Sequence, residues 1–177
     1  MQDSFLVQQV IGGNRNAFKL IVTRYQKPIF RFISAFGFPT IVVDEIAQET
    51  FLKAFKNLQT FDANKSAFST WLFTIAKNTS INNFAKEKKR ARLEMEPDHA
   101  IELNTPQTFL EKKDNAQKLR EAMQRIPMVF RSALTLSYFQ ELSLEEIAVI
   151  EQSSLGTIKS RIFRGKELLR VLLIKRE

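Results

Sequence analysis

Four neutral polar side chains, followed by a lysine, recur at four-residue spacing within residues 66–90. The row consists of Thr70, Thr74, Asn78, Asn82 and Lys86. At this spacing the side chains share one face of a helix. Hydroxyl and amide groups can hydrogen-bond to the edges of nucleic-acid bases, and a lysine can contact a phosphate. The row therefore suits contact with nucleic acid.

A second set of polar and basic side chains lies near the end of the chain. It consists of Thr157, Lys159, Ser160, Arg161, Phe163, Arg164 and Lys166. These residues occupy the outward side of a helix predicted from about Leu155, because apolar residues at spacings of three and four form its inner stripe. Arg and Lys can pair with guanine or phosphate, and an outward Phe can contact a thymine methyl.

A short predicted helix and a four-residue break precede this basic helix. Ser143 and Glu146 have the spacing of a capping box, which predicts the start of the short helix, and the break spans residues 151–154. A short helix, a tight break and a basic helix form the helix-turn-helix pattern, whose second helix enters the major groove of DNA. A helical hairpin with a solvated basic face is the alternative.

Composition argues against catalysis and against a metal or cofactor. The chain has no Cys and a single His, His99, so thiolate metal sites are excluded and His-activated nucleophiles have almost no residues to use. We expect no enzyme activity and no cofactor. The chain opens with no signal-peptide pattern and contains no apolar run near ~20 residues, so we expect a cytoplasmic protein without membrane insertion.

Helical periodicity extends through most of the chain, which contains only five Gly and five Pro. This predicts an all-α fold. Between residues 44 and 58 we assign the apolar members to one buried stripe. They are Ile46, Phe51, Leu52, Phe55 and Leu58. An earlier helix from Asn14 contains Pro28, which lacks a backbone donor and predicts a kink or break near residues 26–28.

Charge and periodicity divide the chain into two basic parts. Residues 1–92 carry 14 Lys and Arg against 6 Asp and Glu, residues 93–115 carry 2 against 6, and residues 116–177 carry 11 against 7. Periodicity lapses after Arg92 and resumes at Thr105-Pro106, a suitable helix start. We therefore predict two small helical domains, 1–92 and 106–177, joined by an acidic linker over 93–105. Two basic blocks separated by an acidic bridge are typical of polyanion-binding proteins, and a generic soluble basic protein is the alternative.

Short runs in both predicted domains resemble the sigma-70 family, specifically its extracytoplasmic-function (ECF) group of bacterial initiation factors. Three runs resemble region 2 of that family: Glu45–Phe51, Phe68–Leu72 and Ile75–Asn78. Three more resemble region 4: Ile126-Pro127, Leu142–Ala148 and Gly156–Arg161. Each run is short, but their order and spacing are specific to this group, and no room is left for a region 3 between them.

The resemblance implies that the chain binds core RNA polymerase and promoter DNA, with an anti-sigma factor as a further possible partner. Polymerase binding would involve Glu45, Gln48, Glu49, Phe51 and Lys53. The −10 promoter element would contact Asn64, Lys65, Ser66, Thr74, Lys77, Asn78, Asn82 and Lys86. The −35 element would contact the seven residues between Thr157 and Lys166 named above. The two domains would correspond to sigma region 2 and the region 4 helix-turn-helix.

Two details of the second domain concern its basic helix, and the first departs from the family pattern. Many relatives enter the basic helix through Leu-Gly-Ile-Pro, whereas residues 151–154 here read EQSS. The turn is then made without Gly, at a cost in backbone energy. Arg161 suits either DNA contact or a brace to Glu145 or Glu146 of the preceding helix.

Two other classes of function are compatible with parts of the sequence. A helix-turn-helix regulator that is not a sigma factor would explain residues 116–177 and leave the runs between Glu45 and Asn82 without a role. A helical adaptor would use its basic surfaces to bind acidic proteins. Only a sigma factor makes core polymerase promoter-specific.

Overall fold

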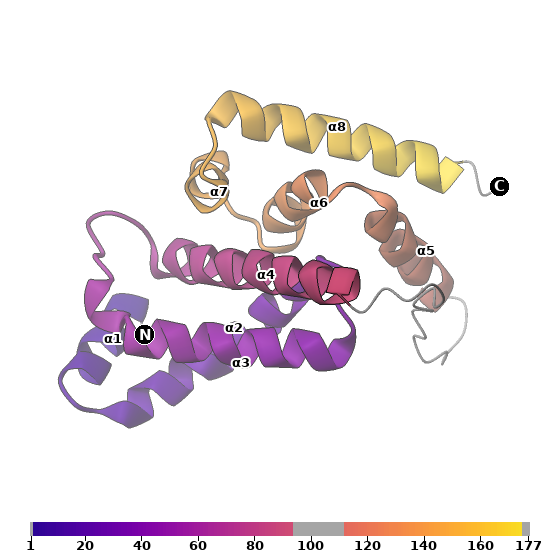
Figure 1. Ribbon diagram of the computed structural model, residues 1–177. Coiled ribbons are helices and arrows are strands. Elements are labelled where there is room, and N and C mark those ends of the chain that lie inside the picture. Colours follow the sequence, from indigo (N-terminus) through magenta and orange to yellow (C-terminus); the bar gives the residue numbers. More distant parts are fainter. Residues whose placement is uncertain (1, 94–111, 175–177) are drawn as a thin grey trace.

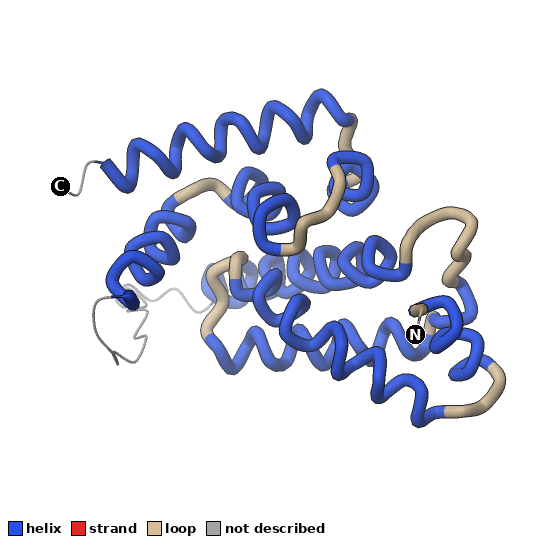
Figure 2. Tube along the Cα trace, turned by 180° about the vertical axis from the view of Figure 1, so that it is seen from behind, coloured by secondary structure: helices blue, strands red, loops and turns tan. Residues whose placement is uncertain are grey.

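The computed structural model describes residues 2–93 and 112–174, and within these ranges the chain consists of helices and connecting turns without strands. Figures 1 and 2 show the molecule from opposite sides. The helices are α1 (Asp3–Ile11), α2 (Arg15–Ser34), α3 (Thr40–Lys56), α4 (Phe68–Leu93), α5 (Lys112–Arg125), α6 (Met128–Leu134), α7 (Leu144–Glu151) and α8 (Leu155–Ile174). A 3₁₀ turn, η1 (Leu58–Thr60), follows α3, and a π-helical turn, η2 (Thr135–Phe139), follows α6. The predicted all-α fold is confirmed.

Helices α1–α4 enclose one part of the apolar core, in the lower half of Figure 1, and the buried cluster continues into α5–α8. The fully buried side chains of this first part come from all four helices and include Leu6, Ile21, Phe32, Ile46 and Leu72. Each such side chain contributes about 1.5–3 kcal/mol by leaving water. This core positions α3 and α4, the two helices that carry most of the predicted polymerase and −10 residues.

Helix α2 runs from Arg15 to Ser34 without a break at Pro28, so the predicted break is wrong. A proline inside a helix costs about 3 kcal/mol because it removes a backbone hydrogen bond and crowds the preceding turn. The neighbouring Ile29 and Phe32 are fully buried, and at about 1.5–3 kcal/mol each their burial offsets that cost. Packing of the helix against the core therefore outweighs the local preference of the proline.

Helices α5–α8 build the second domain, in the upper half of Figure 1. Buried apolar residues from η2, α7 and α8, including Leu136, Ile147, Ile150 and Ile158, line its interior. The capping box at the start of α7 is confirmed. The Glu146 backbone N–H donates to Ser143 Oγ at 3.2 Å, and the Ser143 N–H donates to Glu146 Oε2 at 2.9 Å.

The turn between α7 and α8 is made by a non-glycine residue in the left-handed region. Gln152 has φ 50° and ψ 48°, a conformation that costs an L-residue roughly 1–2 kcal/mol. Ser154 then caps α8, because its Oγ accepts a hydrogen bond from the Thr157 backbone N–H at 3.2 Å. The expected backbone cost of a glycine-free turn therefore falls on Gln152.

The two domains touch each other, with α7 lying beside α4 (Figure 1). Arg131, in the middle of α6, contributes a second contact. Its guanidinium donates to the Ala35 carbonyl at 2.9 Å and to the Ile126 carbonyl at 2.8 Å, and burial lowers the pKa of this group. Residues 94–111, which include His99, most of the predicted linker and the first residues of the predicted second domain, lie outside the described residues.

Candidate nucleic-acid and protein interfaces

A groove between α2 and α3 gathers two of the residues expected to bind polymerase. Gln48 and Phe51 line it from α3, together with Asp44, and Lys27 and Arg31 line it from α2. Apolar walls with both charge signs at the rim suit a protein partner that presents an amphipathic surface. The groove is therefore a candidate surface for a protein partner.

Phe51 also borders a second, more apolar groove that sequence reasoning missed. Its lining also includes the apolar residues Phe18, Val22, Leu52 and Phe55 and the polar residues Arg15, Lys19 and Thr23. Leu52 and Phe55 were expected in the buried stripe of α3, but they are 53% and 38% exposed, so that part of the stripe is wrong. The two grooves together give α3 an outward apolar face that continues past Gln48.

Helical geometry explains this correction. Successive residues of an α-helix turn by about 100°, so Leu52 and Phe55 lie roughly 240° and 180° around α3 from buried Ile46. One stripe cannot hold all three side chains. The core side of α3 uses smaller residues instead, including fully buried Thr50 and Ala54. The angular spread of the large apolar residues was the signal that a second face existed.

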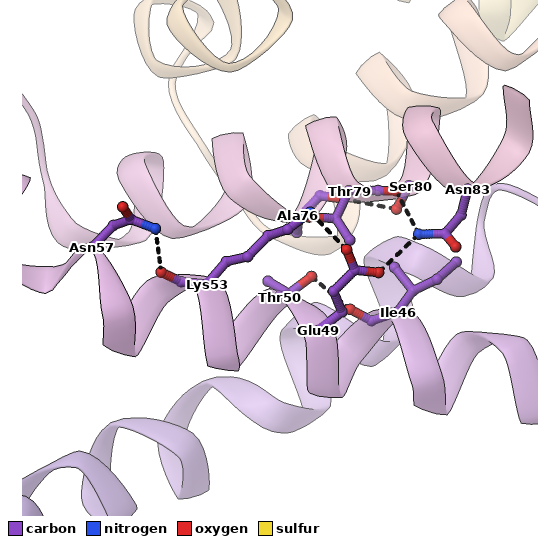
Figure 3. Close-up of polar contacts among 9 residues, drawn as sticks. All are labelled: Ile46, Glu49, Thr50, Lys53, Asn57, Ala76, Thr79, Ser80 and Asn83. Atoms are coloured by element: carbon purple, nitrogen blue, oxygen red, sulfur yellow. Dashed lines mark hydrogen bonds and ion pairs between the residues drawn. The ribbon is translucent and has the colours of Figure 1, made fainter. Parts of the chain in front are cut away.

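Glu49 and Lys53, also expected to bind polymerase, point toward α4 instead (Figure 3). Glu49 Oε1 lies 2.7 Å from Lys53 Nζ, and Glu49 Oε2 accepts from Asn83 Nδ2 at 3.1 Å. Lys53 Nζ also donates to Thr79 Oγ1 at 3.3 Å. The hydrogen bond from Lys53 holds the pKa of the Glu49 carboxyl below its usual range. These two residues brace α3 against α4, whereas Glu45 is exposed and lines neither groove.

The loop before α4 presents the first three residues expected at the −10 element. Asn64 and Lys65 are exposed and Ser66 is half-buried. Asp62 shapes this loop, since its Oδ1 accepts from the Asn64 backbone N–H at 2.9 Å and its Oδ2 lies 3.7 Å from Lys65 Nζ. Helix α4 begins at Phe68, so Ser66 precedes the helix by two residues.

Nearby, Trp71 packs at the edge of the first core. Its ring centroid lies 5.5 Å from that of Phe68 and 5.7 Å from that of Phe61. Its indole is therefore engaged by neighbouring aromatic rings of the same domain.

Along α4, the remaining −10 residues separate into an exposed and a covered group. Asn78, Asn82 and Lys86 are exposed and follow one another at four-residue spacing. Thr74 and Lys77 are half-buried on the side of α4 that meets α7. Lys77 Nζ donates to the Ile150 carbonyl at 3.2 Å. The structure therefore leaves the outer part of the row free for a ligand and covers the inner part with the second domain.

Helix α8 presents the residues expected at the −35 element. Those that are exposed are Thr157, Lys159, Ser160, Phe163, Arg164 and Lys166. A shallow hollow between α6 and α8 is lined by Thr157, Ser160, Arg161 and Arg164 together with Phe130. The helix thus brings one polar and cationic cluster together, with Lys159, Phe163 and Lys166 on a flanking strip.

Arg161 is half-buried and forms an ion pair. Its Nη1 lies 3.2 Å from Glu151 Oε2, so its partner in α7 is Glu151 rather than Glu145 or Glu146. Thr157 is also engaged, because its hydroxyl lies 2.9 Å from the hydroxyl of Ser154. Ser160 and Arg164 also line the hollow. Both are exposed, and their side chains suit contact with base edges.

Over residues 2–93 and 112–174, every helix is too short or too polar to cross a bilayer. The same ranges contain no group of three or more His, Asp or Glu side chains placed to hold a metal ion.

Comparison with known proteins connects both halves of the chain to one family. Residues 21–90 match sigma-70 region 2, and residues 116–169 match sigma-70 region 4. The chain is 35% identical to the RNA polymerase sigma-H factor of Pseudomonas aeruginosa, over 95% of this chain and 92% of that protein. It is 33% identical to the ECF RNA polymerase sigma-E factor of Escherichia coli K12, over 96% and 93%.

A solved structure has a similar fold over nearly the whole chain. It is the structure of CnrH in complex with the cytosolic domain of CnrY, with a TM-score of 0.72, 25% sequence identity and coverage of 99% of both chains. The similarity spans both helical domains.

Proposed function

The chain belongs to the ECF group of the sigma-70 family, and we propose on this basis which of its surfaces bind core RNA polymerase and promoter DNA. It is a sigma factor, which binds core RNA polymerase and directs promoter-specific initiation of transcription. The observation that carries this conclusion is the presence of both family regions, in order, on one chain. A helix-turn-helix regulator would leave the match over residues 21–90 unexplained, and so would a helical adaptor.

Core polymerase binds along the outward face of α3. Gln48 and Phe51 lie in the groove between α2 and α3, and exposed Leu52 and Phe55 extend its apolar surface. Buried apolar side chains framed by a polar rim supply most of the binding energy in protein interfaces. Glu49 and Lys53 support this face from behind through their contacts with α4.

The −10 element binds along the loop at residues 64–66 and the exposed row of α4. Amide groups of Asn78 and Asn82 suit base edges, while Lys65 and Lys86 suit phosphates. The −35 element binds α8, with Ser160 and Arg164 facing base edges and Lys159 and Lys166 facing phosphates. Charged and polar contacts of this kind need no catalytic group, so the chain acts without catalysis of its own.

An anti-sigma factor is a further partner of the two-domain unit. The supporting observation is that a solved structure of similar fold is that of the sigma factor RpoE from Bartonella quintana in complex with the anti-sigma factor NepR. The domains correspond to residues 1–92 and 106–177, and the acidic segment over 93–105 connects them.

The polymerase face is tested by competition for core enzyme between labelled parent chain and unlabelled variants. The double variant Asp44→Ala, Gln48→Ala removes two polar groups from the groove, and we expect it to bind core polymerase about tenfold more weakly, equivalent to roughly 1.4 kcal/mol. Lys56→Ala is the matched control, because Lys56 is exposed on the same helix and lies outside both grooves. Equal affinity of parent and double variant, with unchanged helicity, would refute this assignment.

A further inference from the structure

The loop between η1 and α4 (Figure 1) contains one acidic residue, Asp62. It directly precedes the part of the loop that is expected to bind the −10 element, residues 64–66, which we call the −10 loop. A carboxylate beside DNA repels phosphates, so by charge alone Asp62 weakens the binding that the loop is expected to supply. Its contacts give it a different role.

Asp62 holds the backbone of the whole −10 loop. Its Oδ1 accepts a hydrogen bond from the Asn64 backbone N–H at 2.9 Å. Its carbonyl accepts from the Lys65 N–H at 3.0 Å and from the Ser66 N–H at 3.3 Å. All three backbone N–H groups of the loop therefore donate to one residue. The bond to Oδ1 forms the type of turn that Asp and Asn side chains characteristically make two residues ahead.

Aromatic packing closes the same loop at its base. The ring centroids of Phe61, just before Asp62, and Phe68, the first residue of α4, lie 5.3 Å apart in an edge-to-face arrangement. The Trp71 ring lies 5.7 Å from Phe61. The two ends of the loop are thus fixed to each other from below, and Asp62 sets the conformation of the chain between them.

Asp62 also acts on the charge of the loop. Its Oδ2 lies 3.7 Å from Lys65 Nζ, and the two side chains are 39% and 83% exposed. An ion pair this exposed is weak, so Lys65 can exchange the carboxylate for a phosphate. The pair nevertheless lowers the attraction of the loop for phosphates, which is the same for every DNA sequence.

We propose that Asp62 is a positioning residue that makes the −10 loop selective. It presets the backbone from which Asn64 and Ser66 reach base edges, and it limits the sequence-independent pull of Lys65. A preformed turn avoids an ordering cost on binding, and hydrogen bonds distinguish bases only when donors and acceptors are held in defined directions. The selectivity rests on the proposed −10 role of the loop, whereas the preset backbone is a property of the free chain.

Two substitutions at this position separate the two effects. Asp62→Asn keeps an oxygen that can accept from the Asn64 N–H but removes the charge that pairs with Lys65. Asp62→Ala removes both contacts of the side chain. A role in positioning is therefore retained in the first variant and lost in the second.

The preset backbone is tested by amide hydrogen exchange, measured by NMR on the free full-length chain. We expect Asp62→Ala to speed exchange of the Asn64 amide by about two- to tenfold, as for the loss of one hydrogen bond, and Asp62→Asn to keep it near the parent rate. Amides within α3 and α4 should exchange at the parent rate in both variants, which excludes unfolding of the domain. An unchanged Asn64 rate in Asp62→Ala would overturn the positioning role.

Selectivity is tested with holoenzyme, assembled from core polymerase and each variant, and a single-stranded oligonucleotide library with a randomised central segment. Bound molecules are quantified and sequenced, and core polymerase alone gives the background. We expect Asp62→Asn to prefer the same bases as the parent and to bind every sequence about two- to threefold more tightly. In Asp62→Ala the preference at the position that the loop reads should fall roughly five- to tenfold.

The part played by Lys65 is isolated by repeating Asp62→Asn in a Lys65→Ala background. If the carboxylate acts by pairing with Lys65, its replacement should no longer raise affinity there. A gain that persists would overturn the pairing, since the carboxylate would then repel DNA directly. Full retention of the parent's base preference in Asp62→Ala would overturn the selective role and leave the sigma function intact. A parent holoenzyme that selects no sequence above core polymerase would instead remove the −10 assignment itself.

Discussion

At the scale of single residues, two cations of α8 should act differently on promoter DNA. Arg164 lies in the hollow with Ser160, and Lys166 lies on the flanking strip. A planar guanidinium can form two hydrogen bonds to one guanine, whereas an ammonium acts on phosphates as a point charge. Position and chemistry together indicate that Arg164 contacts a base edge and that Lys166 contacts the phosphate backbone.

This distinction gives a prediction for a library of −35 sequences, measured at two salt concentrations. Arg164→Ala should cost ~1–3 kcal/mol and relax the preference at one base-pair position. Lys166→Ala should weaken binding to all sequences alike and reduce the slope of affinity against salt by about one ion. A uniform loss for Arg164→Ala, with every preference retained, would reduce Arg164 to a backbone contact.

Gln152 gives a second prediction at this scale. Its φ of 50° is unfavourable for a residue with a Cβ, and glycine removes the strain. Gln152→Gly should therefore stabilise the chain by roughly 0.5–1 kcal/mol in denaturant unfolding. Ser153→Gly is the comparison in the same turn, since its backbone has no positive φ. Glycine there adds unfolded-state entropy and removes the hydrogen bond that Ser153 Oγ donates to the Glu151 carbonyl at 3.1 Å, so it should destabilise the chain. A loss of stability for Gln152→Gly would show that the backbone of Gln152 is not strained.

At the scale of elements, close approach of α8 to α6 fixes the orientation of the DNA-facing helix. Gly165 is buried at this crossing, and a Cβ built there would lie 2.9 Å from Leu134 Cδ1 and 3.2 Å from Phe130 Cβ. A side chain would force the helices apart. The close approach at Gly165, on the inner side of α8, therefore sets the orientation of the polar and cationic cluster on the outer side.

Gly165→Ala should consequently destabilise the second domain by about 1–3 kcal/mol, as overpacked cores do. Gly156→Ala provides the comparison on the same helix, because its added Cβ would meet only Ser154 Oγ at 4.0 Å. The higher helix propensity of alanine should leave the stability of the domain unchanged or raise it by up to roughly 1 kcal/mol. Thermal unfolding of the two variants, side by side, measures the difference. Equal melting temperatures would show that α8 can shift without cost.

Elements were predictable from sequence wherever local contacts determine them. The capping box of Ser143 and Glu146 spans three residues, and its spacing alone identified the start of α7. The burial of α3 was not predictable in the same way, because Leu52 and Phe55 are as apolar as core residues and only their angle around the helix separates them. Pro28 was misjudged for a related reason, since packing of α2 outweighed a local preference.

At the scale of the whole molecule, the sequence predicted two basic helical parts but not how they meet. Lys77 and Glu151 are far apart in sequence and belong to different domains, and no pattern in either segment marks them as partners. Both were classified by their own helices, Lys77 as a DNA contact and Glu151 as part of a turn. Their pairing in the folded chain joins the two domains.

The most direct measurement of the chain's function is run-off transcription with purified core polymerase and genomic DNA fragments, with and without this protein. Core enzyme alone should give no specific starts. Addition of the chain should produce a defined set of transcripts whose upstream sequences share two elements, at the positions bound by α4 and α8. The Asp44→Ala, Gln48→Ala double variant should lower the yield of every transcript together. Unchanged, non-specific transcription after addition of a folded, DNA-binding chain would contradict the assignment as a sigma factor.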